Sequence, residues 1–134
     1  MEFTWLSRWQ PQLLAVLRIV AALLFLEHGL MKLFHFPAPQ MPGPLPTLLV
    51  VAAVIELVAG VLITLGLFTR LAAFIASGEM AVGYFMSHFP KSFWPGINMG
   101  DAAILFCFVF LYIAAAGPGA WSIDGARMRN APIR

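Results

Sequence analysis

Four long apolar stretches, separated by short segments rich in proline, glycine or charge, dominate the pattern of this chain. A hydrocarbon core of about 30 Å needs roughly 20 helical residues to cross it, and each stretch is close to that length. The pattern therefore predicts an all-α protein, a bundle of four transmembrane helices built of two helical hairpins. The predicted spans cover residues of about 11–34, 45–67, 70–88 and 98–116.

The segments between the predicted spans carry their own signals. Residues 35–46 hold five prolines and a glycine, so they cannot continue a helix and are predicted to form an outer loop. Residues 66–70 form a short link that closes a tight hairpin, with Thr69 as the expected N-cap of the third span. Amphipathic indole rings settle at the level of lipid headgroups. All four tryptophans fall at ends of predicted spans: Trp5, Trp9, Trp94 and Trp121.

Composition agrees with a membrane location. Hydrophobic residues make up 61% of the chain and charged residues 10%, with a mean hydropathy of +0.88; a soluble domain has about 25% charged residues. At 134 residues the chain is predicted to be a single domain, 1–134. The formal charge of +2 is too small and too scattered for nucleic acid. Cys107 is the only cysteine, which excludes an intramolecular disulfide and a thiolate metal cluster.

The basic residues predict an orientation. Loops on the cytoplasmic side of a membrane carry an excess of lysine and arginine. Both termini and the link between the second and third spans are therefore predicted to be cytoplasmic, and the two proline-rich loops face outward. One side carries Arg8, Arg70, Arg127, Arg129 and Arg134, and the other carries Lys32 and Lys91.

A faint internal repeat accompanies this topology. Arg18 precedes Glu27 by nine positions, and Arg70 precedes Glu79 by the same number. The repeat predicts two parallel hairpins related by an axis along the membrane normal. Coincidence among leucine- and alanine-rich helices explains the match equally well. Arg18 is half a turn off the face of Glu27, so it is expected to reach toward headgroups or pack at another interface.

Each predicted span carries one acidic residue. A charge inside the bilayer costs about 3 kcal/mol or more, so such a group normally faces a protein interior or a water pocket. At 1.5 Å per residue the four acids lie between roughly 5 and 15 Å below the outer surface. We therefore expect them to converge on one wet pocket that opens to the exterior. The four are Glu27, Glu56, Glu79 and Asp101.

Buried carboxylates that lie close together cannot all ionise, so at least one is expected to hold a proton near neutral pH. An imidazole beside them makes proton transfer from a quinol or along a relay chemically reasonable. The residues predicted to handle protons are Glu27, His28, Glu56 and Glu79. The residues predicted to line a quinone pocket are His28, Lys32 and Asp101. Carboxylates with imidazole also suit several metals, but no Glu-x-x-His or His-x-x-x-His spacing occurs among the helical residues, and no metal site is predicted.

Purely structural interpretations stand beside these. Asp101 is spaced to serve as the capping-box partner of Asn98. Lys32 is placed to extend its ammonium to the membrane interface. Glu56 and Glu79 can be satisfied by neighbouring hydroxyls or by backbone groups. The same structural interpretation is open for Glu27, His28, His35 and His88.

The combination of short motifs resembles the DoxX family of small four-span bacterial membrane proteins. The resemblance covers nearly the whole chain. Where the family usually has glutamate before the fourth span, this chain has Asp101, which keeps the acid and shortens its reach. The motifs are His28-Gly29, Lys32-Leu33, the Glu56–Gly60 run, residues 66–73, the Asn98–Asp101 run, and residues 117–124.

The resemblance implies a helical bundle in the bacterial inner membrane and a loose association with redox chemistry. Members include a subunit of thiosulfate:quinone oxidoreductase and a component of a membrane complex linked to thiol and oxidative-stress defence. The leading hypothesis is a redox-associated membrane subunit that binds a quinone and acts with a redox partner protein. Enzymatic activity is then expected only as part of a quinone-linked oxidoreductase. A small proton, ion or solute transporter, or a non-catalytic scaffold or assembly factor, are the alternatives, and a homo-oligomer is open.

Overall fold

The computed structural model describes residues 2–130, and within them every regular element is helical. This confirms the predicted all-α class. Arg134, one of the basic residues used to predict orientation, lies outside the described residues. The elements are α1 (Thr4–Ser7), α2 (Gln10–Phe34), α3 (Thr47–Leu65), α4 (Thr69–Gly83), the π-helical turn η1 (Tyr84–His88), the 3-10 turn η2 (Phe89–Lys91), α5 (Pro95–Asn98), α6 (Asp101–Ala116) and α7 (Ile123–Arg129).

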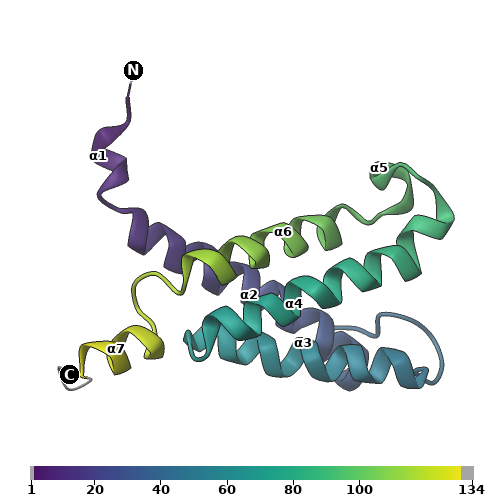
Figure 1. Ribbon diagram of the computed structural model, residues 1–134. Coiled ribbons are helices and arrows are strands. Elements are labelled where there is room, and N and C mark those ends of the chain that lie inside the picture. Colours follow the sequence, from purple (N-terminus) through teal and green to yellow (C-terminus); the bar gives the residue numbers. More distant parts are fainter. Residues whose placement is uncertain (1, 131–134) are drawn as a thin grey trace.

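The four longer helices pack as two pairs. α2 lies chiefly against α3, and α4 lies chiefly against α6, while α3 and α4 join the pairs. Figure 1 shows α1, α7 and the α3–α4 turn gathered at one end of the bundle. The proline-rich loop 35–46 and α5 lie at the other end. We call these the terminal end and the loop end.

Two helices, α2 and α3, are long and apolar enough to cross a membrane. α6 is apolar but has 16 residues, and α4 has 15 residues before its backbone changes to a π-helical turn at Tyr84. Helix length within residues 2–130 therefore does not confirm the predicted four spans. It supports two of them directly.

The predicted start of the fourth span, residue 98, is wrong by three positions. Asn98 ends the separate short helix α5, and Met99 takes a left-handed backbone with φ 62° that cannot continue a helix. The Asn98 side chain accepts a hydrogen bond from the Gly100 N–H at 2.8 Å. Asp101 then begins α6 without forming a capping box with Asn98, because the side chain of Asn98 is engaged before the helix starts.

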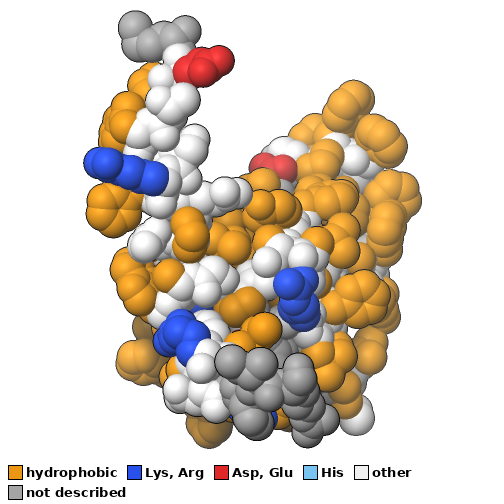
Figure 2. Space-filling model, turned by 60° about the vertical axis from the view of Figure 1, so that its left-hand side comes forward, with side chains coloured by type: hydrophobic (Ala, Val, Ile, Leu, Met, Phe, Trp, Pro, Cys, Tyr) orange, Lys and Arg blue, Asp and Glu red, His pale blue; other side chains and the backbone are white. Residues whose placement is uncertain are grey.

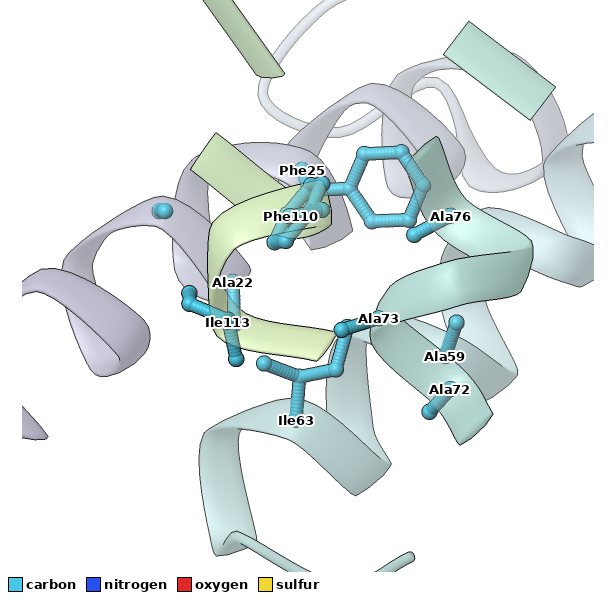
Figure 3. Packing of buried hydrophobic residues seen from close by; sticks show 10 residues of the cluster. Ala22, Phe25, Ala59, Ile63, Ala72, Ala73, Ala76, Phe110 and Ile113 are labelled. Atoms are coloured by element: carbon cyan, nitrogen blue, oxygen red, sulfur yellow. The ribbon is translucent and has the colours of Figure 1, made fainter. Parts of the chain in front are cut away.

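Small side chains bring the helices together at the centre of the bundle. Figure 3 shows alanines of α2, α3 and α4 facing the larger side chains of α2, α3 and α6. The rings of Phe25 and Phe110 meet edge to face, with centroids 5.0 Å apart. Alanine at such positions lets membrane helices approach closely. The labelled core comprises Ala22, Phe25, Ala59, Ile63, Ala72, Ala73, Ala76, Phe110 and Ile113.

Arg18 ties the chain after α6 to the bundle. Its guanidinium is completely buried and donates to the carbonyl oxygens of Pro118, Ala120 and Trp121, at 3.1 Å for Ala120 and 2.9 Å for Trp121. Arg18 therefore packs at an interface within the protein and does not pair with Glu27. The tie holds the segment that leads to α7 against the start of α2.

The N-terminus of α4 is capped from a distant part of the chain. The backbone N–H groups of Phe68 and Thr69 each donate to the Asp124 carboxylate at 2.9 Å. The prediction of Thr69 as N-cap is wrong, because α4 begins at Thr69 itself and no side chain next to it caps the helix. Asp124 sits at the start of α7, where Ser122 accepts a hydrogen bond from the Gly125 N–H.

Replacing Asp124 with asparagine removes the negative charge and one of the two acceptor oxygens at the start of α4, so the free energy of unfolding is expected to fall by about 1 kcal/mol at neutral pH. Burial alone raises the pKa of Asp124, but the N–H groups of Thr69 and Phe68 and the charge of Arg127 outweigh it, so the pKa lies below its usual range. The carboxylate therefore contributes its stability above the unfolded pKa, and this is lost as the pH falls below about 4. Thermal unfolding in detergent should show the two proteins converging at low pH; a constant difference would contradict this.

Candidate functional site

Lys32 and Glu56 form an ion pair between α2 and α3. The Lys32 Nζ lies 2.5 Å from the Glu56 Oε1, and the Glu56 side chain is fully buried while that of Lys32 is 11% exposed. Gly29 makes the pair possible, because a Cβ there would lie 3.0 Å from the Ala53 carbonyl oxygen and 3.1 Å from the Glu56 Cβ. The absence of a side chain lets α2 approach α3 just below Lys32. The expectation that Lys32 extends to the membrane interface is therefore wrong.

Glu79 of α4 is the third member of this site. Its side chain is half-buried and lies near enough to Glu56 and Lys32 to feel their charges, and its Oε2 accepts no hydrogen bond from residues 2–130. Lys32, Glu56 and Glu79 together are called the acid–lysine triad below.

The triad has polar atoms with no partner in the described part of the chain. The Oε2 atoms of Glu56 and Glu79 are both buried and accept no hydrogen bond from residues 2–130. Buried polar atoms normally have a partner, and each one without a partner calls for an explanation. One ammonium against two carboxyls is also neutral only when one proton is bound. The arrangement is therefore suited to binding and releasing a proton, or to contacting a polar ligand group.

The four acids do not converge as expected. Glu56 and Glu79 lie near enough for their charges to interact, whereas Glu27 lies exposed on the outer face of α2 and Asp101 is exposed at the start of α6. The reason for Glu27 is helical geometry, because five positions separate it from Lys32 and turn it roughly 140° around the helix. The expectation of one shared pocket is wrong for these two residues.

His28 lies one helical turn before Lys32 on α2 and packs against α6. Its ring is half-buried, packs edge to face on Phe106 with centroids 5.8 Å apart, and its Nδ1 lies 2.8 Å from the Leu24 carbonyl oxygen. His28 thus contacts α6, while Lys32 contacts α3. No hydrogen bond or ion pair joins His28, Lys32 and Asp101 to one another in residues 2–130, and their role in a quinone pocket stays a prediction.

The hydroxyl groups that offered a structural explanation for the acids bond elsewhere. Ser77 donates to the Cys107 carbonyl oxygen at 2.7 Å, and Thr64 donates to the Gly60 carbonyl oxygen at 2.7 Å. Neither hydroxyl satisfies Glu56 or Glu79. The Cys107 thiol is half-buried next to Ser77, with 3.5 Å between Sγ and Oγ.

A second polar network closes the loop end of α4 and α6. Asn98 is buried and donates through its Nδ2 to the Tyr84 hydroxyl at 3.1 Å and to the Ser92 carbonyl oxygen at 2.9 Å. The His88 Nδ1 lies 3.0 Å from the Asn98 carbonyl oxygen. Sequence reasoning missed Tyr84 and Ser92, because neither residue type stands out in an aromatic, interfacial segment. No buried side-chain N or O atom of this network lacks a partner within residues 2–130, so we interpret the network as structural.

An apolar groove of about 340 Å³ runs between α3 and α4 and was not foreseen from the sequence. Its walls include Ile55, the neighbour of Glu56, and Ile75, which lies one helical turn from Glu79 on the same face of α4. Lys32, Glu56 and Glu79 themselves do not line the groove. Among residues 2–130 no group of three or more His, Cys, Asp or Glu side chains is placed to hold a metal ion.

Comparison with known proteins identifies the relatives of this chain. The sequence profile of the family described as DoxX matches residues 13–89. An uncharacterized protein of Haemophilus influenzae is 43% identical over 89% of this chain and 93% of its own length. The inner membrane protein YphA of Escherichia coli is 31% identical over 86% of this chain and 90% of its own. An uncharacterized membrane protein of Mycobacterium tuberculosis is 30% identical, over 85% and 80%. No solved structure is significantly similar to this chain.

Proposed function

The chain belongs to the DoxX family of membrane proteins, and from this premise we propose that it is a redox-associated membrane subunit that binds a quinone or similar lipophilic carrier. The observation that carries the proposal is the acid–lysine triad, in which the Oε2 atoms of Glu56 and Glu79 are buried and have no partner in residues 2–130. An apolar groove between α3 and α4 includes Ile75, one helical turn from Glu79. Glu56 and Glu79 take the proton-handling role, with Lys32 as counter-charge. Glu27 and Asp101, both exposed, take no part in it.

The groove supplies the apolar part of the pocket that such a carrier requires. Ligand pockets are mostly apolar, have volumes of about 300–1,000 Å³ and hold a few convergent polar groups. The groove of about 340 Å³ is lined by aliphatic and aromatic side chains of α3 and α4. Its position between two helices opens it to lipid, from which a carrier with an isoprenoid tail enters. The tail would lie along Val58 and Leu71, and the ring would lie toward Glu79.

The chemistry assigned to the triad is proton exchange. Reduction of a quinone takes up two electrons and two protons, and the electrons come from a partner protein that carries a redox centre. The Glu56–Glu79 pair supplies a proton to the quinone oxygen and is reprotonated, and the reverse happens on oxidation. Lys32 keeps the buried site close to neutral in either state. Its 11% exposed side chain is the route by which the pair exchanges protons with the exterior.

We place all four long helices in the membrane, as one domain. α4 and η1 form an uninterrupted helical run from Thr69 to His88, and α6 lies along it. One core is shared by α2, α3, α4 and α6. Both ends of the described chain and the α3–α4 turn lie at the terminal end, with Arg70, Arg127 and Arg129, and the positive-inside rule puts this end in the cytoplasm. We take this membrane to be the bacterial inner membrane, because the relative YphA is described as an inner membrane protein.

Replacing Glu79 with glutamine tests the function. A photoreactive quinone analogue, added to the purified protein in lipid nanodiscs, should label α3 or α4 and be displaced by unlabelled quinone. A hydrogen bond that involves a charged group contributes about 1.5–3 kcal/mol, so E79Q should weaken binding roughly 10- to 100-fold. The control is E27Q, which removes an exposed acid and should leave binding unchanged. No saturable labelling of the native protein, or equal effects of the two variants, would contradict the proposal.

Proton transport without a carrier is the second candidate. It is favoured by the partial exposure of Lys32, which links the fully buried Glu56 to the loop end. Liposomes that contain the protein and a pH-sensitive dye would then show proton flux, and Glu56→Gln would abolish it. A protein that neither binds the quinone analogue nor conducts protons would be assigned to the third class, a scaffold or assembly factor.

A further inference from the structure

Phe68 stands in the turn between α3 and α4 and lines the apolar groove between these helices. The other residues that line the groove belong to α3, between Val54 and Leu62, and to α4, between Leu71 and Ile75. The turn joins the two helices at the terminal end of the bundle (Figure 1). Phe68 is therefore the wall of the groove at this end.

The backbone of Phe68 has a conformation that an aromatic residue seldom adopts. Its φ is 49°, in the left-handed region, where any residue with a Cβ is strained. Such a conformation persists only where surrounding contacts fix it, and it occurs often at ligand sites and switch regions. Burial does not fix it here, because Phe68 is 56% exposed.

Contacts from α7 fix the turn instead. The Asp124 carboxylate accepts hydrogen bonds from the N–H groups of Phe68 and Thr69. The Asp124 N–H in turn donates to the Gly66 carbonyl oxygen at 2.8 Å. The Arg127 guanidinium lies over the Phe68 ring, 5.7 Å from its centroid, which is within the range of a cation–π interaction. Both the backbone and the ring of Phe68 are thus held from α7.

α7 is itself fixed against the bundle. A Cβ at Gly66 would lie 2.4 Å from the Ser122 Cβ, so the glycine lets the start of α7 approach the turn closely. Ser122 is buried and caps α7. Arg18 holds the carbonyl groups of the segment just before Ser122. α7 is therefore a firm support for Phe68.

We propose that Phe68 closes the terminal end of the groove and that α7 positions it there through Asp124 and Arg127. When the groove holds the tail of a lipophilic carrier, Phe68 sets how far that tail extends toward the terminal end, a consequence that rests on the proposed function. The C-terminal segment then controls the length of the groove, although Asp124 and Arg127 do not line it.

The terminal end of the groove lies close to water. Leu62, the groove residue of α3 nearest this end, is three residues from the end of the helix, which is about 5 Å along its axis. Figure 2 shows Lys and Arg side chains among apolar ones on the face around the terminal end. A water-soluble reagent therefore approaches position 62 from this side, past Phe68.

Cysteine reactivity tests the closure. In a Cys107→Ala background in lipid nanodiscs, L62C should react slowly with a charged, water-soluble maleimide. F68A removes the cover, so it should raise that rate about tenfold or more, while F68W keeps a ring and should leave the rate low. The matched control is F74A, because Phe74 is 63% exposed on α4 and does not line the groove. No acceleration in F68A, or equal acceleration in F74A, would overturn the closure.

A double variant tests the part of α7. D124A removes the charge-assisted hydrogen bond of the Phe68 N–H, so the L62C rate should rise about tenfold. F68A/D124A should react no faster than F68A alone, because both changes act through one ring. The control is R129Q, since the Arg129 guanidinium lies near Gly125 of its own helix, and it should keep the native rate. Additive effects in the double variant, or none in D124A, would overturn positioning by α7.

A quinone analogue with its photoreactive group at the end of the tail connects the closure with the proposed function. In the native protein it should label the groove near Leu62 or Leu71, and in F68A the label should move on to α7. Identical labelled positions in the two proteins would show that Phe68 does not limit the tail. Absence of saturable labelling in the native protein would contradict the proposed function, whereas the closure is decided by the L62C rates, so the two fail separately.

Discussion

Replacing Arg18 with leucine is expected to detach the segment that follows α6 and to lower the free energy of unfolding by about 3–5 kcal/mol. Arg18 is the largest fully buried side chain, and its guanidinium donates to three backbone carbonyls. A hydrogen bond to a charged group contributes about 1.5–3 kcal/mol. Leucine removes all three donors and leaves their acceptors without partners, so the loss belongs among the largest expected of single substitutions.

Arg70 provides the matched control for this prediction. It also donates to backbone carbonyls, those of Ala114 and Ala115, but it is exposed. Arg70→Leu should therefore cost about 1 kcal/mol or less, as solvated ionic contacts do. Thermal unfolding of both variants in detergent, with limited proteolysis of the chain after residue 116, checks the difference. Equal losses of stability, or a protease-resistant C-terminal segment in R18L, would show that Arg18 does not hold this segment.

The sequence predicted those features that depend on local chemistry. The length and hydropathy of α2 and α3, and the five prolines of the loop between them, suffice to place both helices. The all-α class and the family resemblance followed in the same way. Each of these signals is contained in a contiguous stretch of residues, so no knowledge of tertiary contacts was needed.

Features that depend on distant residues could not be predicted in this way. Asp124 caps α4 from 55 positions away, and Arg18 reaches carbonyls about 100 positions away. Nothing local to Thr69 marks Asp124 as its partner. A nearby N-cap was therefore expected at Thr69, although the polar groups at the helix start are satisfied by a contact that only the folded chain creates.

The direction in which each acid points was also beyond the sequence. In a soluble helix the apolar face identifies the interior, but a helix that is apolar all round does not. α2 is of this kind, so Glu27 and Lys32 were both expected to face inward. Small residues would have been the better guide. Gly29 is buried and marks the close approach of α2 to α3, and Lys32 lies three positions further along α2.

The region matched by the family profile contains some of the acidic residues and not others. It covers residues 13–89 and so contains Lys32, Glu56 and Glu79, and it ends before Asp101. Glu27 and His28 lie inside the matched region as well, so the match alone does not single out the triad.

Breaking the Lys32–Glu56 pair from either side is expected to lower the free energy of unfolding by about 3–5 kcal/mol, because the remaining charge is buried without a partner. Lys32→Met leaves the Glu56 carboxylate unpaired, and Glu56→Leu leaves the Lys32 ammonium unpaired. The double variant K32M/E56L removes both charges and replaces them with apolar groups of similar size. Such replacements are often neutral or stabilising, so the double variant should recover most of the stability lost in either single one.

The double variant separates a structural pair from a functional one. If the triad handles protons for a bound carrier, K32M/E56L should fold as the native protein does and yet lose quinone binding by about tenfold or more, the value of at least one charged hydrogen bond. Unfolding in detergent gives the first quantity, and displacement of the photoreactive quinone gives the second. A stable double variant that still binds quinone normally would show that the pair serves only to join α2 to α3. A double variant less stable than both single ones would show that the buried charges are not coupled.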